Sequence, residues 1–117
     1  MIKSFKDLFI WQESMVLVTS IYTITNGFPA SEIYGLTSQL RRSAVSIPSN
    51  IAEGYGRNST NDYKRFLQMA VGSLYELQTQ IEIAFNLQYI QEQKYIEMTS
   101  ISVELDKMLY SIIQKIK

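Results

Sequence analysis

The segment from Leu36 to Arg57 most narrowly limits the fold, because it carries two stripes of side chains at helical spacing. The apolar stripe recurs every three or four residues, as on the buried face of a helix. Its members are Leu36, Leu40, Ala44 or Ile47, and Ile51. The polar stripe is made of small hydroxyls, an amide, a carboxylate and arginines. Its members are Arg42, Ser46, Asn50, Glu53 and Arg57. A helix that is apolar on one face must bury that face against other elements.

A first helix is predicted before this segment, from about Leu8 to Asn26. Its predicted core face contains apolar residues spaced by three and four. These are Leu8, Trp11, Met15, Val18, Tyr22 and Thr25, with Leu17, Ile21 and Ile24 widening the stripe. Asn26-Gly27 favours a helix stop, and Pro29 prevents the helix from resuming. Ser31 is then the predicted N-cap of the second helix, which extends to about Tyr55.

Two more helices are predicted after it. Ser59 and Asp62 have the spacing of a capping box and open a third helix of about thirty residues. Its seam is Tyr63, Leu67, Ala70, Leu74, Leu77, Ile81 and Ala84. A turn near Tyr89 to Gln93 leads to the fourth helix, which has one apolar face. That face is Tyr95, Met98, Ser102, Leu105, Leu109, Ile112 and Ile116.

No segment shows the alternation of a strand, so the predicted fold is all-α. We expect a single domain, residues 1–117, folded as an antiparallel up-down four-helix bundle. Pro48 lies inside the second helix and removes one backbone donor, which predicts a kink there. The alternative is a break at Ile47 followed by a short restarted helix. The kink is favoured because the polar stripe stays in phase across the proline.

Composition excludes several classes of site. The chain has no Cys and no His, which excludes Cys/His zinc sites, Ser-His-Asp and Cys-His nucleophiles and Glu-x-x-His di-iron centres. We therefore expect no enzyme, no metal and no cofactor. The 11 basic and 11 acidic residues balance, which argues against a strongly electrostatic nucleic-acid binder. The sequence shows neither a signal-peptide run nor a membrane span, and a cytoplasmic protein is expected.

The polar stripe is interpreted as a structural hydrogen-bond network within or between bundles. If the turn between the second and third helices centres near Ser59, residues whose numbers sum to about 118 face each other. Three pairs are then predicted, namely Ser46 with Gly72, Arg42 with Glu76, and Asn50 with Gln68, and Glu53 falls near Lys64 and Arg65. The alternatives are a ligand or phosphate site and, least favoured, a catalytic site, because no nucleophile or metal ligand accompanies Glu53 and Glu76.

Basic residues around the same turn give a second hypothesis. Contacts to RNA or DNA phosphates are assigned to Arg41, Arg57, Lys64 and Arg65. Assembly of several copies would multiply such a patch. The alternative is that the arginines pair with nearby carboxylates and cancel the positive field.

The chain resembles a known bacterial family of four-helix bundles, the proteins encoded in intervening sequences of 23S ribosomal RNA genes. The most specific matching run is Ser46-Ile-Pro-Ser-Asn-Ile-Ala-Glu-Gly54. Other matching segments cover nearly the whole chain. They are Phe5-Lys-Asp-Leu8, Trp11-Gln12, Phe28-Pro29, Glu32, Tyr34-Gly-Leu36, Gln39-Leu-Arg-Arg42, Gly56-Arg57, Phe66-Leu67, Gly72-Ser73 and Glu76-Leu77.

The resemblance implies a ring-forming bundle, commonly a homopentamer, with no assigned enzymatic activity. Relatives that accompany diversity-generating retroelements resemble accessory factors that bind a reverse transcriptase and nucleic acid through basic surfaces. This chain departs from them because it is electrically neutral. The expected function is therefore a non-enzymatic interaction scaffold, with an RNA or protein partner, and the alternative is an RNA- or DNA-binding protein.

Overall fold

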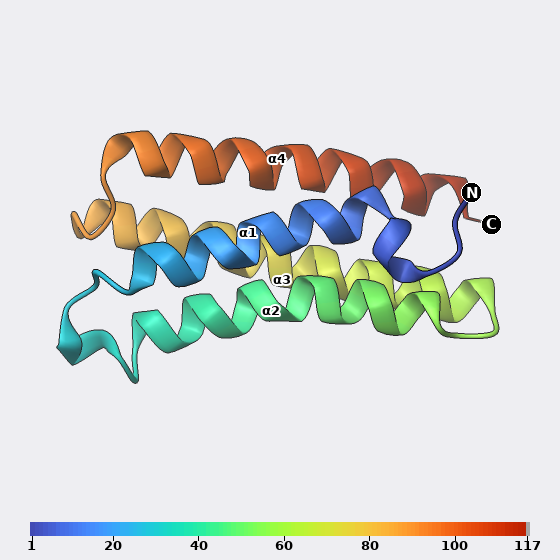
Figure 1. Ribbon diagram of the computed structural model, residues 1–117, viewed down its shortest axis with the longest axis horizontal. Helices are drawn as coiled ribbons and strands as arrows, with labels where there is room; N and C mark the ends of the chain where they lie inside the picture. The colour runs from blue at the N-terminus through green and yellow to red at the C-terminus, as the bar shows by residue number, and fades with distance from the viewer. Residues whose placement is uncertain (117) are drawn as a thin grey trace.

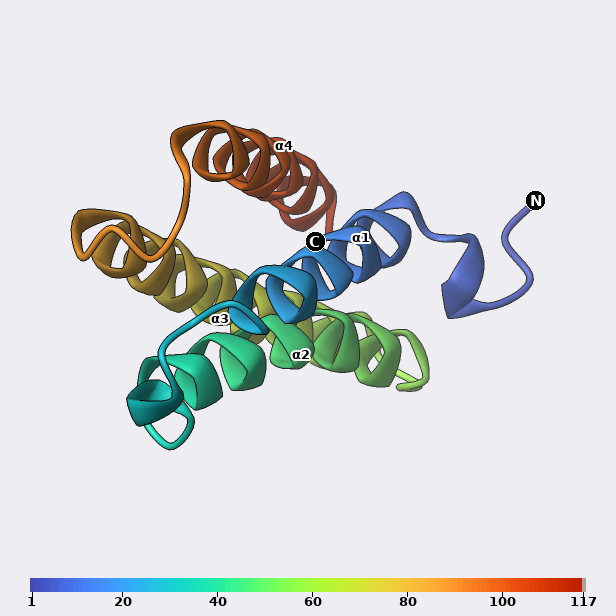
Figure 2. The ribbon, with the colours of Figure 1, turned by 60° about the vertical axis from the view of Figure 1, so that its left-hand side comes forward.

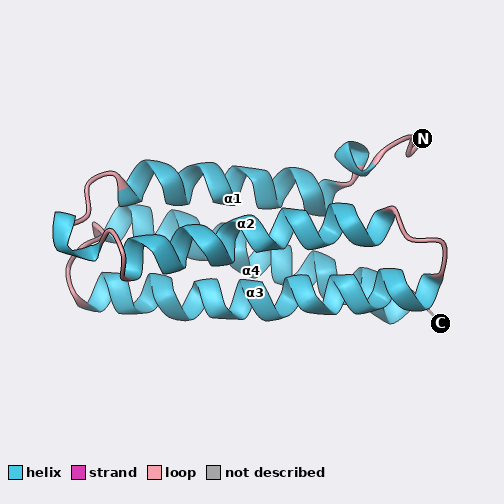
Figure 3. Ribbon diagram, turned by 90° about the horizontal axis from the view of Figure 1, so that it is seen from below, coloured by secondary structure: helices cyan, strands magenta, loops and turns pink. Residues whose placement is uncertain are grey.

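Four α-helices make up most of the chain, and no strand occurs in residues 1–116, the part that this computed structural model describes. The helices are α1 (Phe9–Thr25), α2 (Leu36–Tyr55), α3 (Thr60–Asn86) and α4 (Glu92–Lys115). Short 3-10 turns, Phe5–Asp7 and Ala30–Glu32, precede α1 and α2. The predicted all-α class is confirmed, and Figure 3 shows the helices joined by short loops.

The chain runs back and forth along the long axis of a rod of 43 × 25 × 21 Å. The α1–α2 and α3–α4 connections lie at one end, whereas the α2–α3 turn and both termini lie at the other (Figure 1). Each helix packs against two others, and α2 and α3 share the most extensive contact. Figure 2 shows α4 and α2 on opposite sides of the bundle, with α1 and α3 between them.

The start of α2 corrects one prediction. Ser31 does not cap this helix, which begins at Leu36, because residues Ala30–Glu32 form a separate 3-10 turn. The Glu32 carboxylate takes the capping role, since its Oε1 accepts a hydrogen bond of 3.0 Å from the Leu36 N–H. The predicted cap of α3 is confirmed, because Ser59 Oγ accepts from the Asp62 N–H at 3.0 Å.

Pro48 does not break α2. The helix is continuous from Leu36 to Tyr55 with the proline inside it, so a break at Ile47 is wrong. The kink stays a prediction. The Pro48 ring is buried on the side of α2 that faces Trp11 and Val18 of α1.

The predicted core face is confirmed for α2, α3 and α4 and is corrected for α1. The predicted apolar stripe of α2 is fully buried, as are most of the predicted faces of α3 and α4. On α1 the buried face is instead Ile10, Ser14, Leu17, Ile21 and Thr25. Two of the residues assigned to the core, Met15 and Tyr22, are exposed. The reason is that α1 is apolar on two neighbouring stripes, and helical period alone does not say which stripe faces inward.

The seam between α2 and α3 closes around Gly54. A Cβ added at this glycine would lie 2.6 Å from the Cβ of Phe66, so only a residue without a side chain fits there. Further along, the buried Ser43 Oγ donates a hydrogen bond of 2.7 Å to Gln80 Oε1. The predicted close contact of Ser46 with Gly72 is wrong, because Gly72 is exposed and nothing lies within 4 Å of a Cβ added there.

Candidate interaction surfaces

The polar stripe of α2 is bonded mainly to its own helix. Ser46 Oγ donates to the Arg42 carbonyl at 2.9 Å, and Asn50 Nδ2 donates to the Ser46 carbonyl at 2.8 Å. These are local bonds between residues four apart, which replace water without linking α2 to another helix. The first three members of the stripe therefore form a ladder along one helix and not a network between helices.

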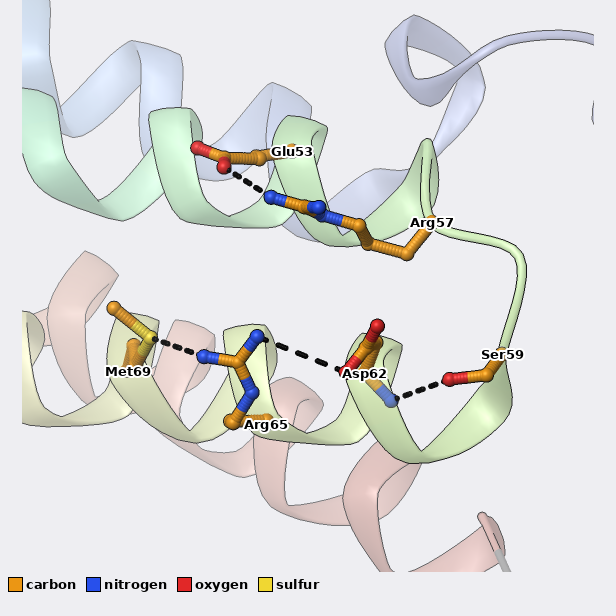
Figure 4. A network of polar contacts seen from close by, with 6 residues as sticks. All are labelled: Glu53, Arg57, Ser59, Asp62, Arg65 and Met69. Carbon is orange, nitrogen blue, oxygen red and sulfur yellow. Dashed lines mark hydrogen bonds and ion pairs between the residues drawn. The ribbon is translucent and has the colours of Figure 1, made fainter.

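The last two members form a surface ion pair. Arg57 Nη2 lies 2.7 Å from Glu53 Oε2, and roughly half of each side chain is exposed. On α3, Arg65 Nη2 lies 3.7 Å from Asp62 Oδ1. Figure 4 shows the first pair where α2 runs into the turn and the second on α3, with no contact drawn from Glu53 to Arg65. Exposed pairs of this kind contribute little to stability.

Arg42 and Glu76 lie around one surface hollow, which Tyr34, Gln39 and Gln80 also line. Both charged side chains are exposed. Within residues 1–116, no ion pair of 4.0 Å or less joins Arg42 to Glu76. The structure therefore places the two residues near each other without forming the predicted bond.

The four basic residues assigned to phosphate contacts do not form one patch. Arg57, Lys64 and Arg65 lie near the α2–α3 turn, and the guanidiniums of Arg57 and Arg65 both stack on the Phe66 ring, 4.8 and 4.7 Å from its centre. Arg41 lies towards the other end of α2. The predicted cluster is thus split between the two ends of the bundle.

Arg41 is held against α1. Its Nε donates to Thr25 Oγ1 at 2.9 Å, and its Nη2 donates to Asn26 Oδ1 at 3.1 Å. The guanidinium also lies 4.7 Å from the centre of the Tyr22 ring. These contacts fix the position of the charge, and no carboxylate among the described residues neutralises it.

An apolar groove runs between α1 and α2, and the sequence analysis missed it. We call it the α1–α2 groove and define it by two adjoining hollows that share Val45. Its apolar members are Trp11, Met15, Val18, Tyr22, Ile33, Val45, Pro48 and Ala52. Exposure of Met15, Tyr22 and Val45 is 38 to 42%. The signal was present in the sequence as the second apolar stripe of α1, but that stripe was assigned to the core.

A second apolar surface lies on α4, which we call the α4 stripe. It consists of Ile96, Val103 and Tyr110, spaced by seven residues on the side away from the core. These side chains are 57, 43 and 64% exposed. The seven-residue spacing could have revealed the stripe. It was overlooked because the apolar inward face of α4 is sufficient by itself to predict a helix there.

Tyrosine–carboxylate hydrogen bonds border the α4 stripe. Tyr75 Oη donates to Asp106 Oδ1 at 3.1 Å, and Tyr95 Oη donates to Glu82 Oε1. Each bond holds the phenol proton, and the hydrogen bond to its carboxylate raises the pKa of Tyr75 and of Tyr95.

Two other tyrosines are also perturbed. The hydrogen bond that Tyr89 Oη donates to Glu32 Oε2 at 2.9 Å raises the pKa of Tyr89. Burial raises the pKa of Tyr63, with a smaller contribution from Tyr55. All four hydroxyls stay protonated at neutral pH, so they act as hydrogen-bond donors rather than as proton acceptors.

Neither a cluster of metal-ligating side chains nor a membrane-crossing helix occurs in residues 1–116. No three His, Cys, Asp or Glu side chains in residues 1–116 gather closely enough to hold a metal ion. In the same residues, no helix combines the length and the hydropathy that crossing a membrane requires.

Comparison with known proteins places the chain in a family. The 23S rRNA-intervening sequence protein family matches residues 6–111. A solved structure of a protein with unknown function from the S23 ribosomal protein family of Bacteroides thetaiotaomicron is similar in fold, with a TM-score of 0.81 and 24% sequence identity. That similarity covers 91% of this chain and 99% of the other. No curated protein shows a significant match. The chain belongs to the 23S rRNA-intervening sequence protein family.

Proposed function

We propose that this protein is a non-enzymatic scaffold of the cytoplasm that assembles with copies of itself into a ring. The observation that carries the proposal is the exposed α1–α2 groove, supported by the three exposed apolar side chains of the α4 stripe. Monomeric proteins expose single apolar side chains freely, but contiguous apolar surfaces usually mark interaction sites. Both surfaces follow whole helices, which suits contacts between rods of equal length.

The contacts made by carboxylates within residues 1–116 support a non-enzymatic role. Catalysis needs a nucleophile or proton acceptor in a recess with converging groups. Glu53 forms an exposed ion pair with Arg57, and Glu82 and Asp106 accept hydrogen bonds from tyrosine hydroxyls. These carboxylates are engaged in structural contacts on the surface of the bundle.

The geometry favours the scaffold over the nucleic-acid alternative. Arg57 and Arg65 each face a carboxylate three or four residues away along the chain, and Arg41 is bonded to α1 at the other end of α2. A phosphate would have to displace these partners, and the chain has no overall positive charge to compensate. Titration of structured RNA at ~50 mM salt, where phosphate contacts are strongest, should show no saturable binding.

The mass of the full chain in solution tests the proposal. Light scattering coupled to size exclusion, at micromolar concentration, should give a discrete assembly several times heavier than the 13.5 kDa chain. A stable monomer over the whole concentration range would overturn the proposal.

A further inference from the structure

We infer that the α1–α2 groove of one copy receives the α4 stripe of the next copy, so that the ring is built from one repeated contact between two different surfaces. The inference rests on the self-assembly proposed above and names the surfaces that perform it. Contacts between unlike surfaces, called heterologous, leave one free groove and one free stripe after each addition. They therefore continue until the ring closes.

The two surfaces lie on opposite sides of the bundle. Val103 and Tyr110 stand three residues before and four residues after Asp106, so they share its side of α4. Asp106 accepts a hydrogen bond from Tyr75, which places this side towards α3. The groove lies between α1 and α2, and α2 makes no contact with α4 (Figure 2). One copy can therefore engage two neighbours at once without a clash between them.

The apolar residues of the two surfaces have the same spacing. On α4 the exposed side chains recur every seven residues, which is about 10 Å along a helix. In the groove, Met15 and Tyr22 on α1 are also seven apart, as are Val45 and Ala52 on α2. Seven residues are about two turns of an α-helix. Helices lying side by side can therefore place the side chains of the stripe and of the groove at the same intervals along their length.

Charge is also complementary. Arg41 and Arg42 line the groove, and no carboxylate does so. Beside the α4 stripe stand the carboxylates of Glu82 and Asp106 and the ammonium of Lys107, and within residues 1–116 no ion pair of 4.0 Å or less joins Lys107 to either carboxylate. These three groups sum to one net negative charge. Between two copies, the arginines of one groove would attract the carboxylates beside the other copy's stripe and would repel the arginines of the other copy's groove.

The charges also agree in position. Arg41 is bonded to Thr25 and Asn26 at the end of α1, and Glu82 is bonded to Tyr95 near the start of α4. The end of α1 and the start of α4 lie at the same end of the rod (Figure 1). Copies standing side by side with parallel axes would therefore bring Arg41 towards Glu82. Lys107, four residues after Val103 and three before Tyr110, lies beside the stripe and also lines a hollow between α4 and the N-terminal segment.

Substitution of one central residue on each surface tests the inference. Val45→Asp places a charge in the middle of the groove, and Val103→Asp does the same in the stripe. Each variant alone should lose the assembly and run as a monomer, because each has one of the two required surfaces blocked. Mixed together, they should form a one-to-one dimer, since the intact stripe of the first fits the intact groove of the second. The dimer cannot grow, because its remaining surfaces both carry aspartate.

Ile83→Asp provides the matched control. Ile83 on α3 is 44% exposed and belongs to neither surface, so this variant should keep the mass of the unmodified protein. Circular dichroism must show native helicity for each variant. If an aspartate variant fails to fold, Val45→Ser and Val103→Ser are used in place of the aspartate pair. Each serine variant alone should then be a monomer, and the mixture should again give a one-to-one dimer.

The outcomes separate this inference from the proposed function. If the unmodified chain assembles and Val45→Asp or Val103→Asp still assembles normally, the surfaces named here are wrong while self-assembly stands. If each variant alone runs as a dimer, each surface contacts its own kind, and if both are monomers whose mixture gives no dimer, the groove and the stripe do not pair. Either result overturns the heterologous contact. A monomeric unmodified chain would overturn the self-assembly itself.

Discussion

The seam between α2 and α3 and the outward sides of α1 and α4 use apolar and small residues in opposite ways. In the seam, Gly54 lets the backbone approach Phe66, and the Ser43–Gln80 hydrogen bond is buried. On the outward sides, side chains as large as Tyr22 and Tyr110 are left 42 and 64% exposed. The first region is complete within one chain, whereas the second leaves apolar surface in water.

The difference teaches that stability and assembly are placed on separate parts of this small bundle. A change in the seam should alter the free energy of unfolding of one chain. A change on an outward side should alter association and leave that free energy nearly unchanged. The predictions below test this separation.

The largest effect is expected at the seam. Gly54→Ala adds a Cβ that would lie 2.6 Å from the Phe66 Cβ, so one of the two helices must shift. Overpacking of this kind costs roughly 1–3 kcal/mol, and we expect a loss of about 2 kcal/mol in the free energy of unfolding. Urea denaturation followed by circular dichroism measures it.

Gly72→Ala is the matched control, because it makes the same substitution in α3 where nothing lies within 4 Å of the new Cβ. It should stabilise the protein by roughly 0.5–1 kcal/mol, the usual advantage of alanine in a helix. Equal effects at the two glycines would contradict the account of the seam.

A smaller effect is expected for the buried hydrogen bond of the seam. Ser43→Ala removes the donor to Gln80 Oε1 and should cost about 1 kcal/mol. A double-mutant cycle with Gln80→Ala isolates the interaction, and a coupling energy near zero would show that the bond contributes nothing to the seam.

Changes on the outward sides should affect association alone. In the unmodified protein, the melting temperature should rise with protein concentration, because assembly stabilises the folded chain. Val103→Ser should abolish this dependence and change the free energy of unfolding of the dilute chain by less than about 0.5 kcal/mol. A concentration dependence that survives in Val103→Ser would mean that the stripe takes no part in association.

The smallest effect concerns pH. The raised pKa of Tyr95 means that its hydrogen bond to Glu82 contributes stability below the ordinary tyrosine pKa of about 10 and loses it as the pH rises through the raised value. Tyr95→Phe should therefore melt slightly below the unmodified protein at neutral pH, with the gap closing in alkali.

Tyr34→Phe serves as the comparison, because Tyr34 is 95% exposed and its hydroxyl has no hydrogen-bond partner in the described residues. Its melting temperature should follow that of the unmodified protein at every pH. A gap between Tyr95→Phe and the unmodified protein that stays constant into alkali would count against the Tyr95–Glu82 bond.

The sequence predicted the inward faces where one stripe was clearly the most apolar. On α2 the contrast between Leu36, Leu40 and Ile51 and the polar stripe left one choice, and the choice was correct. On α1 two apolar stripes adjoin, and only the packing of the other helices decides that Leu17 is buried and Met15 exposed. The exposed stripe of α1, which was wrongly assigned to the core, forms one wall of the α1–α2 groove.

Register and loop details needed the folded chain. Gly54 and Gly72 are both glycines inside helices, and only the packing shows that a neighbouring helix closes on the first. Ser31 has the chemistry of an N-cap, but the side chain of Glu32 reaches the start of α2 instead. The α4 stripe could be predicted from its seven-residue spacing, whereas its place opposite the groove could not.

Cross-linking of single cysteines tests the central claim most directly, because the natural chain has none. Val45→Cys and Val103→Cys variants, mixed and treated with a short bis-maleimide, should give a dimer that contains one chain of each kind. Each variant treated alone should stay uncross-linked. Cross-linked dimers of Val45→Cys alone or of Val103→Cys alone, with none in the mixture, would contradict the pairing of groove with stripe.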